Sequence, residues 1–195
     1  MTPRQRLLWI LLIVAFVATY GTTLYIQAGF GPVGVIVGSM IGGLVGWLKT
    51  TAKRPANPRA ILPAYLLMLA LFMVHVEEEY LWRFHGRISG IFHSHWSEHD
   101  YVFLIVLLGP MVWILGGIGL WLRHPLGNFI VWFMLVGMIL GEPTHYLVFP
   151  FFEGGRYHYF PGMWTALFPM IPAVYAVWRI RADHRAVEAS SSETR

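Results

Sequence analysis

Two short segments of the chain combine histidine and carboxylate side chains at helical spacing. His75, Glu78 and Glu79 stand at positions i, i+3 and i+4, so they share one face of a helix. Glu142 and His145 have the Glu-x-x-His spacing that di-iron and di-manganese carboxylate bundles use. Imidazole and carboxylate together suit a divalent transition metal, and the number of carboxylates favours iron over zinc or manganese. The pattern therefore predicts metal ligands at these five positions, with Glu79 and Glu142 also placed for acid–base work.

The segment between the two motifs is rich in histidine and allows two interpretations. His95–His99 reads H-x-x-E-H, in which two histidines bind zinc and the glutamate acts as general base. Alternatively, Ser97 is the N-cap of the next helix and Asp100 completes its capping box. We prefer the capping interpretation for these two residues. The other residues of the segment stay candidates. His93, His95 and His99 are candidate ligands that fold down onto the carboxylates, and Glu98 is a candidate catalytic group.

Three further residues are candidates for substrate contact. Trp82 follows the first motif, and Arg156 and His158 lie after the second. Arg156 can hold an anionic head group or pair with Glu153, and His158 can cover the site. An equally weighted alternative is a short aromatic turn at the membrane interface, where tyrosine and phenylalanine are enriched.

The composition identifies the solvent in which these groups must work. Of the 195 residues 56% are hydrophobic and 12% charged, against about 25% charged in an average soluble domain. These values exclude a disordered chain, a nucleic-acid-binding basic domain and an ordinary soluble enzyme. The absence of cysteine excludes disulfides, iron–sulfur clusters and thiolate sites. Most of the chain is therefore expected to lie in lipid.

Apolar stretches of about 20 residues predict an all-α bundle of six transmembrane helices. We expect a single domain over residues 1–184 and a disordered cytoplasmic tail over 185–195. The first stretch also resembles a signal peptide, but its length favours an uncleaved helix. The six expected spans are Leu7–Gln27, Phe30–Leu48, Ile61–Phe84, Tyr101–Leu122, Asn128–Phe152 and Gly162–Ile180.

Basic residues predict the orientation, because cytoplasmic loops carry an excess of lysine and arginine. With both termini cytoplasmic, 11 of the 14 basic residues lie inside, and the exceptions are Arg83, Arg87 and Arg156. Seven of the nine histidines and seven of the ten acids then lie toward the outer face. This predicts a protein of the plasma membrane, the inner membrane in a bacterium, with its site facing the periplasmic or extracellular side.

The depths of the two motifs agree. His75 and Glu142 each lie 14 residues beyond the start of their span, about 21 Å from the inner surface. A charge inside a bilayer costs about 2.5–3.5 kcal/mol even on mild scales, so these groups must compensate one another or bind a cation. The alternative is a purely structural ion-pair network that includes Arg83.

The second apolar stretch carries a glycine at every fourth position: Gly34, Gly38, Gly42 and Gly46. Such a stripe lets another helix approach closely. It predicts either a homodimer interface or packing against the first helix of the same chain, and we favour the latter.

The combination of His75-x-x-Glu78-Glu79, Thr144-His145 and the segment Arg156–Ala166 resembles the HXXEE-domain family of bacterial multi-span membrane proteins. The resemblance covers about residues 61–180 and implies the fold rather than a mechanism. A looser similarity links His75-x-x-x-Glu79 and Glu142-x-Thr144 to the emopamil-binding sterol isomerases, which would imply acid–base chemistry without a metal.

The sequence therefore predicts a membrane metalloenzyme that acts on a lipid-like or otherwise apolar substrate, more as an oxidoreductase than as a hydrolase. Metal-free isomerisation by paired glutamates and transport of metal ions or protons are the alternatives. Against transport, the cytoplasmic half of the predicted bundle has no polar path and no inverted repeat is apparent.

Overall fold

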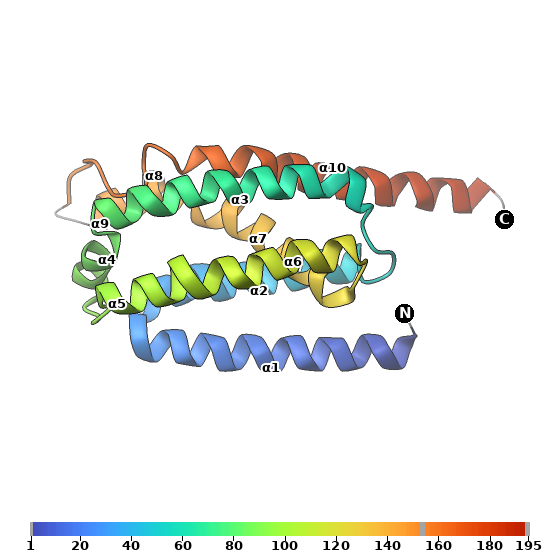
Figure 1. Ribbon diagram of the computed structural model, residues 1–195, viewed down its shortest axis with the longest axis horizontal. Coiled ribbons are helices and arrows are strands. Elements are labelled where there is room, and N and C mark those ends of the chain that lie inside the picture. Colours follow the sequence, from blue (N-terminus) through green and yellow to red (C-terminus); the bar gives the residue numbers. More distant parts are fainter. Residues whose placement is uncertain (1, 153–154, 194–195) are drawn as a thin grey trace.

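The computed structural model describes residues 2–152 and 155–193, and every regular element in that part of the chain is a helix (Figure 1). Long helices lie side by side, and shorter ones gather at one end of the bundle. The elements in chain order are α1 (Pro3–Ala28), α2 (Phe30–Lys49), α3 (Pro58–Leu81), α4 (Phe84–Phe92), α5 (Glu98–Tyr101), η1 (Val102–Leu108), α6 (Gly109–Trp121), α7 (Pro125–Gly141), α8 (Thr144–Leu147), α9 (Phe149–Phe152) and α10 (Leu167–Glu193).

Five segments of the described chain are long and apolar enough to cross a membrane. Their outward faces carry exposed apolar side chains such as Leu11, Ile114 and Ile118, which suit lipid rather than water. The sixth predicted span, in α10, is not among the five, because only the first half of that helix is apolar. The five segments are Pro3–Ile26, Phe30–Lys49, Pro58–Leu81, Glu98–Trp121 and Pro125–Phe152.

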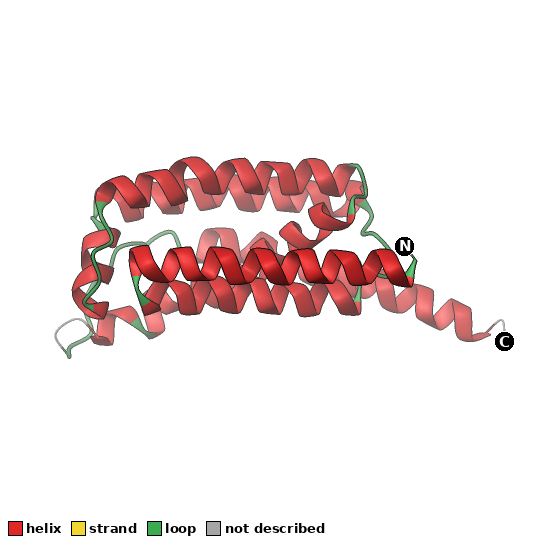
Figure 2. Ribbon diagram, turned by 90° about the horizontal axis from the view of Figure 1, so that it is seen from below, coloured by secondary structure: helices red, strands yellow, loops and turns green. Residues whose placement is uncertain are grey.

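Different elements form the two ends of the bundle. At the α4 end lie α4, α5, α8 and α9 (Figure 1). At the opposite N-terminal end lie the start of α1, the connection 50–57 and the turn 122–124. The C-terminal part of α10 extends past the other helices at this second end, as Figure 2 also shows. A disordered tail was expected from residue 185, whereas the helix continues to Glu193.

The glycine stripe of α2 packs against α7 rather than against α1. A Cβ added at Gly42 would lie 2.8 Å from Cγ1 of Val136, and one at Gly46 would lie 2.5 Å from the ring of Trp132, both on α7. Gly34 and Gly38, in contrast, have no described atom within 4 Å of the added Cβ. The prediction of close intrachain packing is thus correct for half of the stripe, but the partner helix is a different one.

The α4 end departs most from the predicted spans. α3 ends at Leu81 and the chain turns at Arg83, whose φ of 56° is left-handed. The 16-residue loop expected from His85 to Asp100 contains α4 and α5 instead. The expected fifth span is divided into α7, α8 and α9 near Pro143, because proline has no N–H to continue a helix.

A cavity of about 810 Å³ lies inside the bundle, bounded by α1, α2, η1, α6 and α7. Its walls are almost entirely apolar, and the ionisable groups that line it include His75 and Glu79 on α3, Glu142 just after α7 and His145 on α8. The π-helical turn η1 borders it, with the Gly109 N–H bonded to the Leu104 carbonyl ahead of Pro110. The fold therefore places the predicted motifs against a space suited to an apolar ligand.

Candidate metal centre

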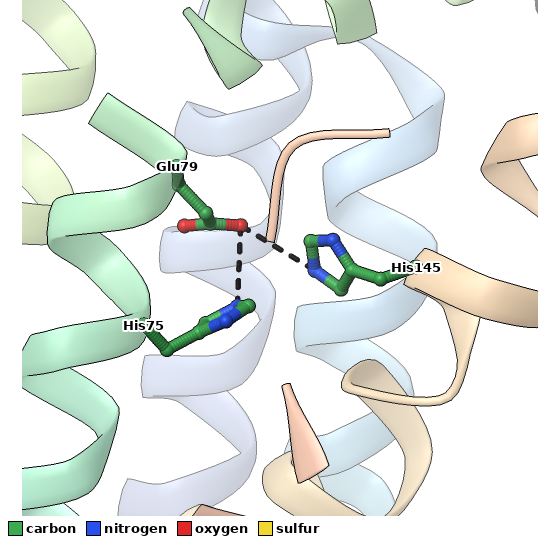
Figure 3. A group of neighbouring side chains, drawn as sticks. All are labelled: His75, Glu79 and His145. Atoms are coloured by element: carbon green, nitrogen blue, oxygen red, sulfur yellow. Dashed lines mark ion pairs between the residues drawn. The ribbon is translucent and has the colours of Figure 1, made fainter. Parts of the chain in front are cut away.

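Three ligand atoms converge at the α4 end of the cavity (Figure 3). Nε2 of His75 lies 3.6 Å from Oε1 of Glu79, and Nε2 of His145 lies 3.4 Å from the same oxygen. All three residues are buried, and one ligand atom from each lies within 4.8 Å of the others. Tetrahedral ligands at bond lengths of about 2.0–2.2 Å would be about 3.3–3.6 Å apart. The spacing of both histidines from Glu79 therefore matches that of ligands around one ion.

The ring of His75 is held by a hydrogen-bonded chain that leads away from the cluster. Its Nδ1 lies 3.1 Å from Oγ1 of Thr165, and that hydroxyl donates to Oε2 of Glu78. Because the Thr165 hydroxyl donates its proton to Glu78, its oxygen accepts the hydrogen bond from Nδ1–H of His75. This assignment leaves Nε2 facing the cluster, as in metal sites whose ligating histidine is oriented by a second hydrogen bond.

His145 and Glu79 are oriented in the same way. Nδ1 of His145 donates to the carbonyl oxygen of Pro161 over 2.6 Å, and a carbonyl can only accept. Oε2 of Glu79 accepts from the hydroxyl of Tyr101 over 2.8 Å, which leaves Oε1 for the cluster. Each of the three side chains thus has one polar atom committed outside the cluster and one directed into it.

Gly162 allows the segment before α10 to close over both imidazoles. Its φ of 93° favours glycine. A Cβ at this position would lie 2.5 Å from Nδ1 of His145 and 2.6 Å from Cε1 of His75. Only a residue without a side chain lets the backbone come this close.

Glu142 stands beside the triad rather than within it. Its Oε2 lies 3.0 Å from Nε2 of His75, and the residue is only 4% exposed. The prediction that these two residues are level is confirmed by this distance. Glu142 lines the cavity, so its carboxylate is placed between the candidate metal site and a bound apolar molecule.

Glu78 was predicted as a ligand, but its carboxylate is engaged elsewhere. Oε1 accepts hydrogen bonds from the Tyr159 hydroxyl and from the backbone N–H groups of Gly162 and Trp164. Oε2 accepts from both the N–H and the hydroxyl of Thr165. The residue fastens the segment before α10 to α3, and so supports the site from outside.

The histidine-rich segment does not reach the cluster. His93, His95 and His99 are exposed, and the side chain of His99 is 89% exposed beside Asp100. Glu98 is exposed as well and accepts from the hydroxyl of Tyr80. The capping interpretation is confirmed, because Ser97 accepts from the N–H of Asp100 at the start of α5. The H-x-x-E-H pattern therefore brings no ligand to this site.

The three predicted substrate-binding residues lie away from the cavity wall. Trp82 is exposed and packs edge-on against Tyr159 and Trp164. Arg156 is exposed, and its carbonyl accepts from Nδ1 of His158. The pairing suggested between Arg156 and Glu153 involves a residue outside the described part of the chain.

Aromatic side chains cover the cluster at the α4 end. The ring of Phe84, the first residue of α4, lies 5.3 Å from that of His145, and Phe149 and Phe160 complete the cover. Burial lowers the pKa of His85, the next residue of α4, with a further contribution from Arg83. Burial also raises the pKa of Tyr159, and its hydrogen bond to Glu78 adds to the effect. The cover excludes water from the site.

The supporting residues Tyr101, Thr165, Pro161 and Gly162 were not predicted. Tyrosine and threonine near a membrane interface are common, so their types alone carry no signal. A weak signal exists for Gly162, since a Pro-Gly pair predicts a turn. Comparisons with protein-family models, with curated proteins and with solved structures give no match for this chain.

Proposed function

We propose that this chain is an integral membrane metalloenzyme that acts on a lipophilic substrate. The observation that carries the proposal is the convergence of His75 Nε2, His145 Nε2 and Glu79 Oε1, each oriented by a partner outside the cluster, beside the cavity of about 810 Å³. A purely structural ion pair needs no such orientation of both imidazoles. The arrangement is that of a ligand set.

Charge compensation supports a divalent cation. Glu79 and Glu142 are both buried at membrane depth, and two carboxylates there are costly without positive charge nearby. One divalent ion balances the pair while both histidines stay neutral. Without the ion, the pair depends on a proton shared with His75.

The ligand set suggests the chemistry. Two histidines and one carboxylate with open positions are used by non-haem iron oxygenases, and a bound ferrous ion would supply oxygen chemistry there. The apolar walls suit oxidation of a hydrocarbon substrate, so we place an oxidoreductase first. The same ligand set also occurs in catalytic zinc sites, where Glu142 would serve as general base for hydrolysis.

The residues around the triad have separate tasks in this proposal. Glu142 accepts or returns a proton at the cavity wall, next to Nε2 of His75. Phe84 and Phe149 exclude water from the reacting centre. The apolar walls of α2, α6 and α7 hold the substrate by burial of its surface.

Metal-free isomerisation is the second candidate, and one observation favours it. His75 and Glu142 form a pair at 3.0 Å that faces the apolar cavity, as a proton-transfer couple would. This chemistry uses the same residues but does not need the convergence of His145 on Glu79.

The membrane arrangement completes the proposal. We propose α10 as a sixth span, both termini in the cytoplasm and the site toward the outer face, in the inner membrane of a bacterium. The packing of α10 along α3 and α7 supports the sixth span. A homodimer contact also remains part of the proposal, because Gly34 and Gly38 leave open space on α2. We further propose that the chain belongs to the HXXEE-domain family.

Elemental analysis of the detergent-purified protein tests the proposal. We expect about one divalent transition metal per chain, with iron supporting oxidation and zinc supporting hydrolysis. The variants His75→Ala and His145→Ala lose the metal, whereas the matched exposed variants His95→Ala and His99→Ala keep it. Glu142→Gln retains most of the metal and loses turnover.

Three results would contradict the metal centre. A protein that contains no metal after purification and after incubation with ferrous or zinc ions would leave isomerisation as the better function. Equal metal loss in the buried and exposed histidine variants would indicate adventitious binding. Metal flux into liposomes that depends on His75 would favour transport.

A further inference from the structure

A second cavity, of about 750 Å³, lies at the N-terminal end of the bundle, opposite the metal centre. It is formed by the connection between α2 and α3, by the turn after α6 and by one face of α10. The walls here are polar rather than apolar. The residues that line it come from three distant parts of the sequence, at Thr50–Ile61, Trp121–Arg123 and Arg179–Val187.

Four arginines and one aspartate line this cavity. Arg179 pairs with Asp183 at 3.3 Å on α10. The other three arginines have no ion pair with a carboxylate in the described part of the chain. The cavity therefore has an uncompensated positive charge, and the arginines that carry it are Arg54, Arg59 and Arg123.

A buried hydroxyl provides an independent sign of a ligand. Thr51 lines the cavity, is 4% exposed, and its Oγ1 has no hydrogen-bond partner among the described residues. A buried hydroxyl without a partner is unfavourable unless something binds it. α3 also begins at the cavity with Pro58, so the positive end of its dipole faces the same space.

The walls are fixed by contacts between helices. The N–H of Ala56 donates to Oδ1 of Asn128 over 3.1 Å, and Asn128 in turn donates to the carbonyl of His124. The first bond ties the α2–α3 connection to the start of α7, and the second holds the Asn128 side chain in place. Arg123 occupies a left-handed backbone position with φ of 55° between α6 and α7. The arginines are therefore presented by an ordered structure.

We propose that this cavity binds a phosphate group. Guanidinium groups bind phosphate through paired N–H donors, and a hydroxyl supplies a further donor. The group belongs either to the head of an anionic phospholipid in the adjoining leaflet or to a free phosphate compound. Basic pockets between helices at the cytoplasmic face are suited to such head groups. This site is separate from the metal centre and does not depend on the function proposed for it.

The test is a binding measurement on the full chain in a zwitterionic detergent. Phosphatidylglycerol and inorganic phosphate are titrated separately, with phosphatidylcholine as the neutral lipid, and binding is followed by native mass spectrometry and by the shift in melting temperature. The double variant Arg59→Gln/Arg123→Gln is compared with Arg4→Gln/Arg181→Gln. The latter pair is exposed at the same end, outside the cavity lining, and removes the same charge.

We expect saturable binding that is weaker by about tenfold or more in the cavity variant and nearly unchanged in the control. Saturation by phosphatidylglycerol alone identifies a lipid head group, whereas saturation by inorganic phosphate, with competition between the two, identifies a free compound. Equal loss in both double variants, or no saturation, overturns the proposal, because the attraction is then a general property of a basic surface.

The variant Thr51→Val provides a second test, and it leaves the charge of the cavity unchanged. We expect several-fold weaker binding with unchanged helix content by circular dichroism. If the arginine variant does not fold, this variant decides the question. Unchanged affinity in Thr51→Val would show that the buried hydroxyl faces no ligand, and the site would be rejected.

Discussion

The side chains at the candidate metal centre are positioned by their second polar atoms. Tyr101 is the clearest case, because its buried hydroxyl donates to Glu79 Oε2 and makes a longer contact of 3.3 Å with the Val76 carbonyl. It selects which carboxylate oxygen faces the two imidazoles. A ligand set oriented in this way binds a metal without first rearranging.

Tyr101→Phe removes this hydrogen bond without changing the packing volume greatly. We expect metal affinity to fall by about 10- to 100-fold, because Glu79 loses the donor that orients it. Competition with a chelator of known affinity measures the change. Tyr80→Phe is the matched control, since that hydroxyl donates to the exposed Glu98. Equal affinities in the two variants would show that the Tyr101 hydroxyl does not orient the ligand.

Individual residues of the site differ in how well the sequence predicts their positions. His75, Glu79, Glu142 and His145 were recognised because ionisable groups in an apolar helix require a reason. Glu78 was assigned with them because it shares the face of its neighbour. Its true partners come from residues 159–165, whose return to α3 depends on tertiary structure and leaves no local pattern.

At the scale of elements, α3 supplies both ligands and anchors. Glu79 faces the metal centre, whereas Glu78 accepts five hydrogen bonds from the segment that precedes α10. The Thr165 hydroxyl joins the two functions, because it bridges Glu78 and His75. The position of α10 is thus coupled to the orientation of a ligand.

Glu78→Gln weakens this anchor. An amide carries one acceptor oxygen instead of two, so at least one of the N–H groups of Gly162, Trp164 and Thr165 loses its acceptor. We expect a loss of stability of about 1–3 kcal/mol and faster hydrogen exchange at these amides. Glu77→Gln is the control, because Glu77 is exposed on the same helix. Unchanged exchange in Glu78→Gln would contradict the anchoring role.

α4 gives the protein a dependence on pH. Burial lowers the pKa of His85, so the unfolded chain takes up a proton more readily than the folded one. Stability is then present above the ordinary histidine pKa of about 6.5 and is lost as the pH falls below it. We expect His85→Phe to reduce the drop in melting temperature between about pH 7.5 and about pH 5. His99→Phe, at an exposed site, should keep the full drop, and a full drop in both would refute the role of His85.

For the whole molecule, the prediction of an all-helical bundle is confirmed for the described residues, and five of the six predicted spans are long and apolar enough to cross a membrane. The breaks at Arg83 and Pro143 decide how the α4 end closes. Pro143 accounts for the end of α7, but the directions of α8 and α9 depend on packing. The cavity was not predicted, because the space between helices is a property of their joint arrangement.

Gly137→Leu tests whether the cavity is where the substrate binds. Gly137 lines it from α7, and an added Cβ meets only Ser39, at 3.8 Å. A leucine side chain therefore occupies the space without touching the metal ligands. We expect the metal content to stay unchanged while the lipid that co-purifies, measured by mass spectrometry, falls several-fold. Gly90→Leu, at an open position of α4, is the control. Unchanged lipid in Gly137→Leu would place the substrate elsewhere.

The candidate ligands and their orienting partners are synthesised at different times. His75 and Glu79 enter the bilayer with the third helix, but His145 follows about 70 residues later, and the Pro161 carbonyl and Thr165 hydroxyl come later still. A nascent chain that stops before α8 carries Glu79 with its partner Tyr101, but it has His75 without Thr165 and lacks His145 altogether. If the site binds an ion as proposed, its acquisition is a late step of biogenesis, completed only once the last third of the polypeptide has folded back on the first two.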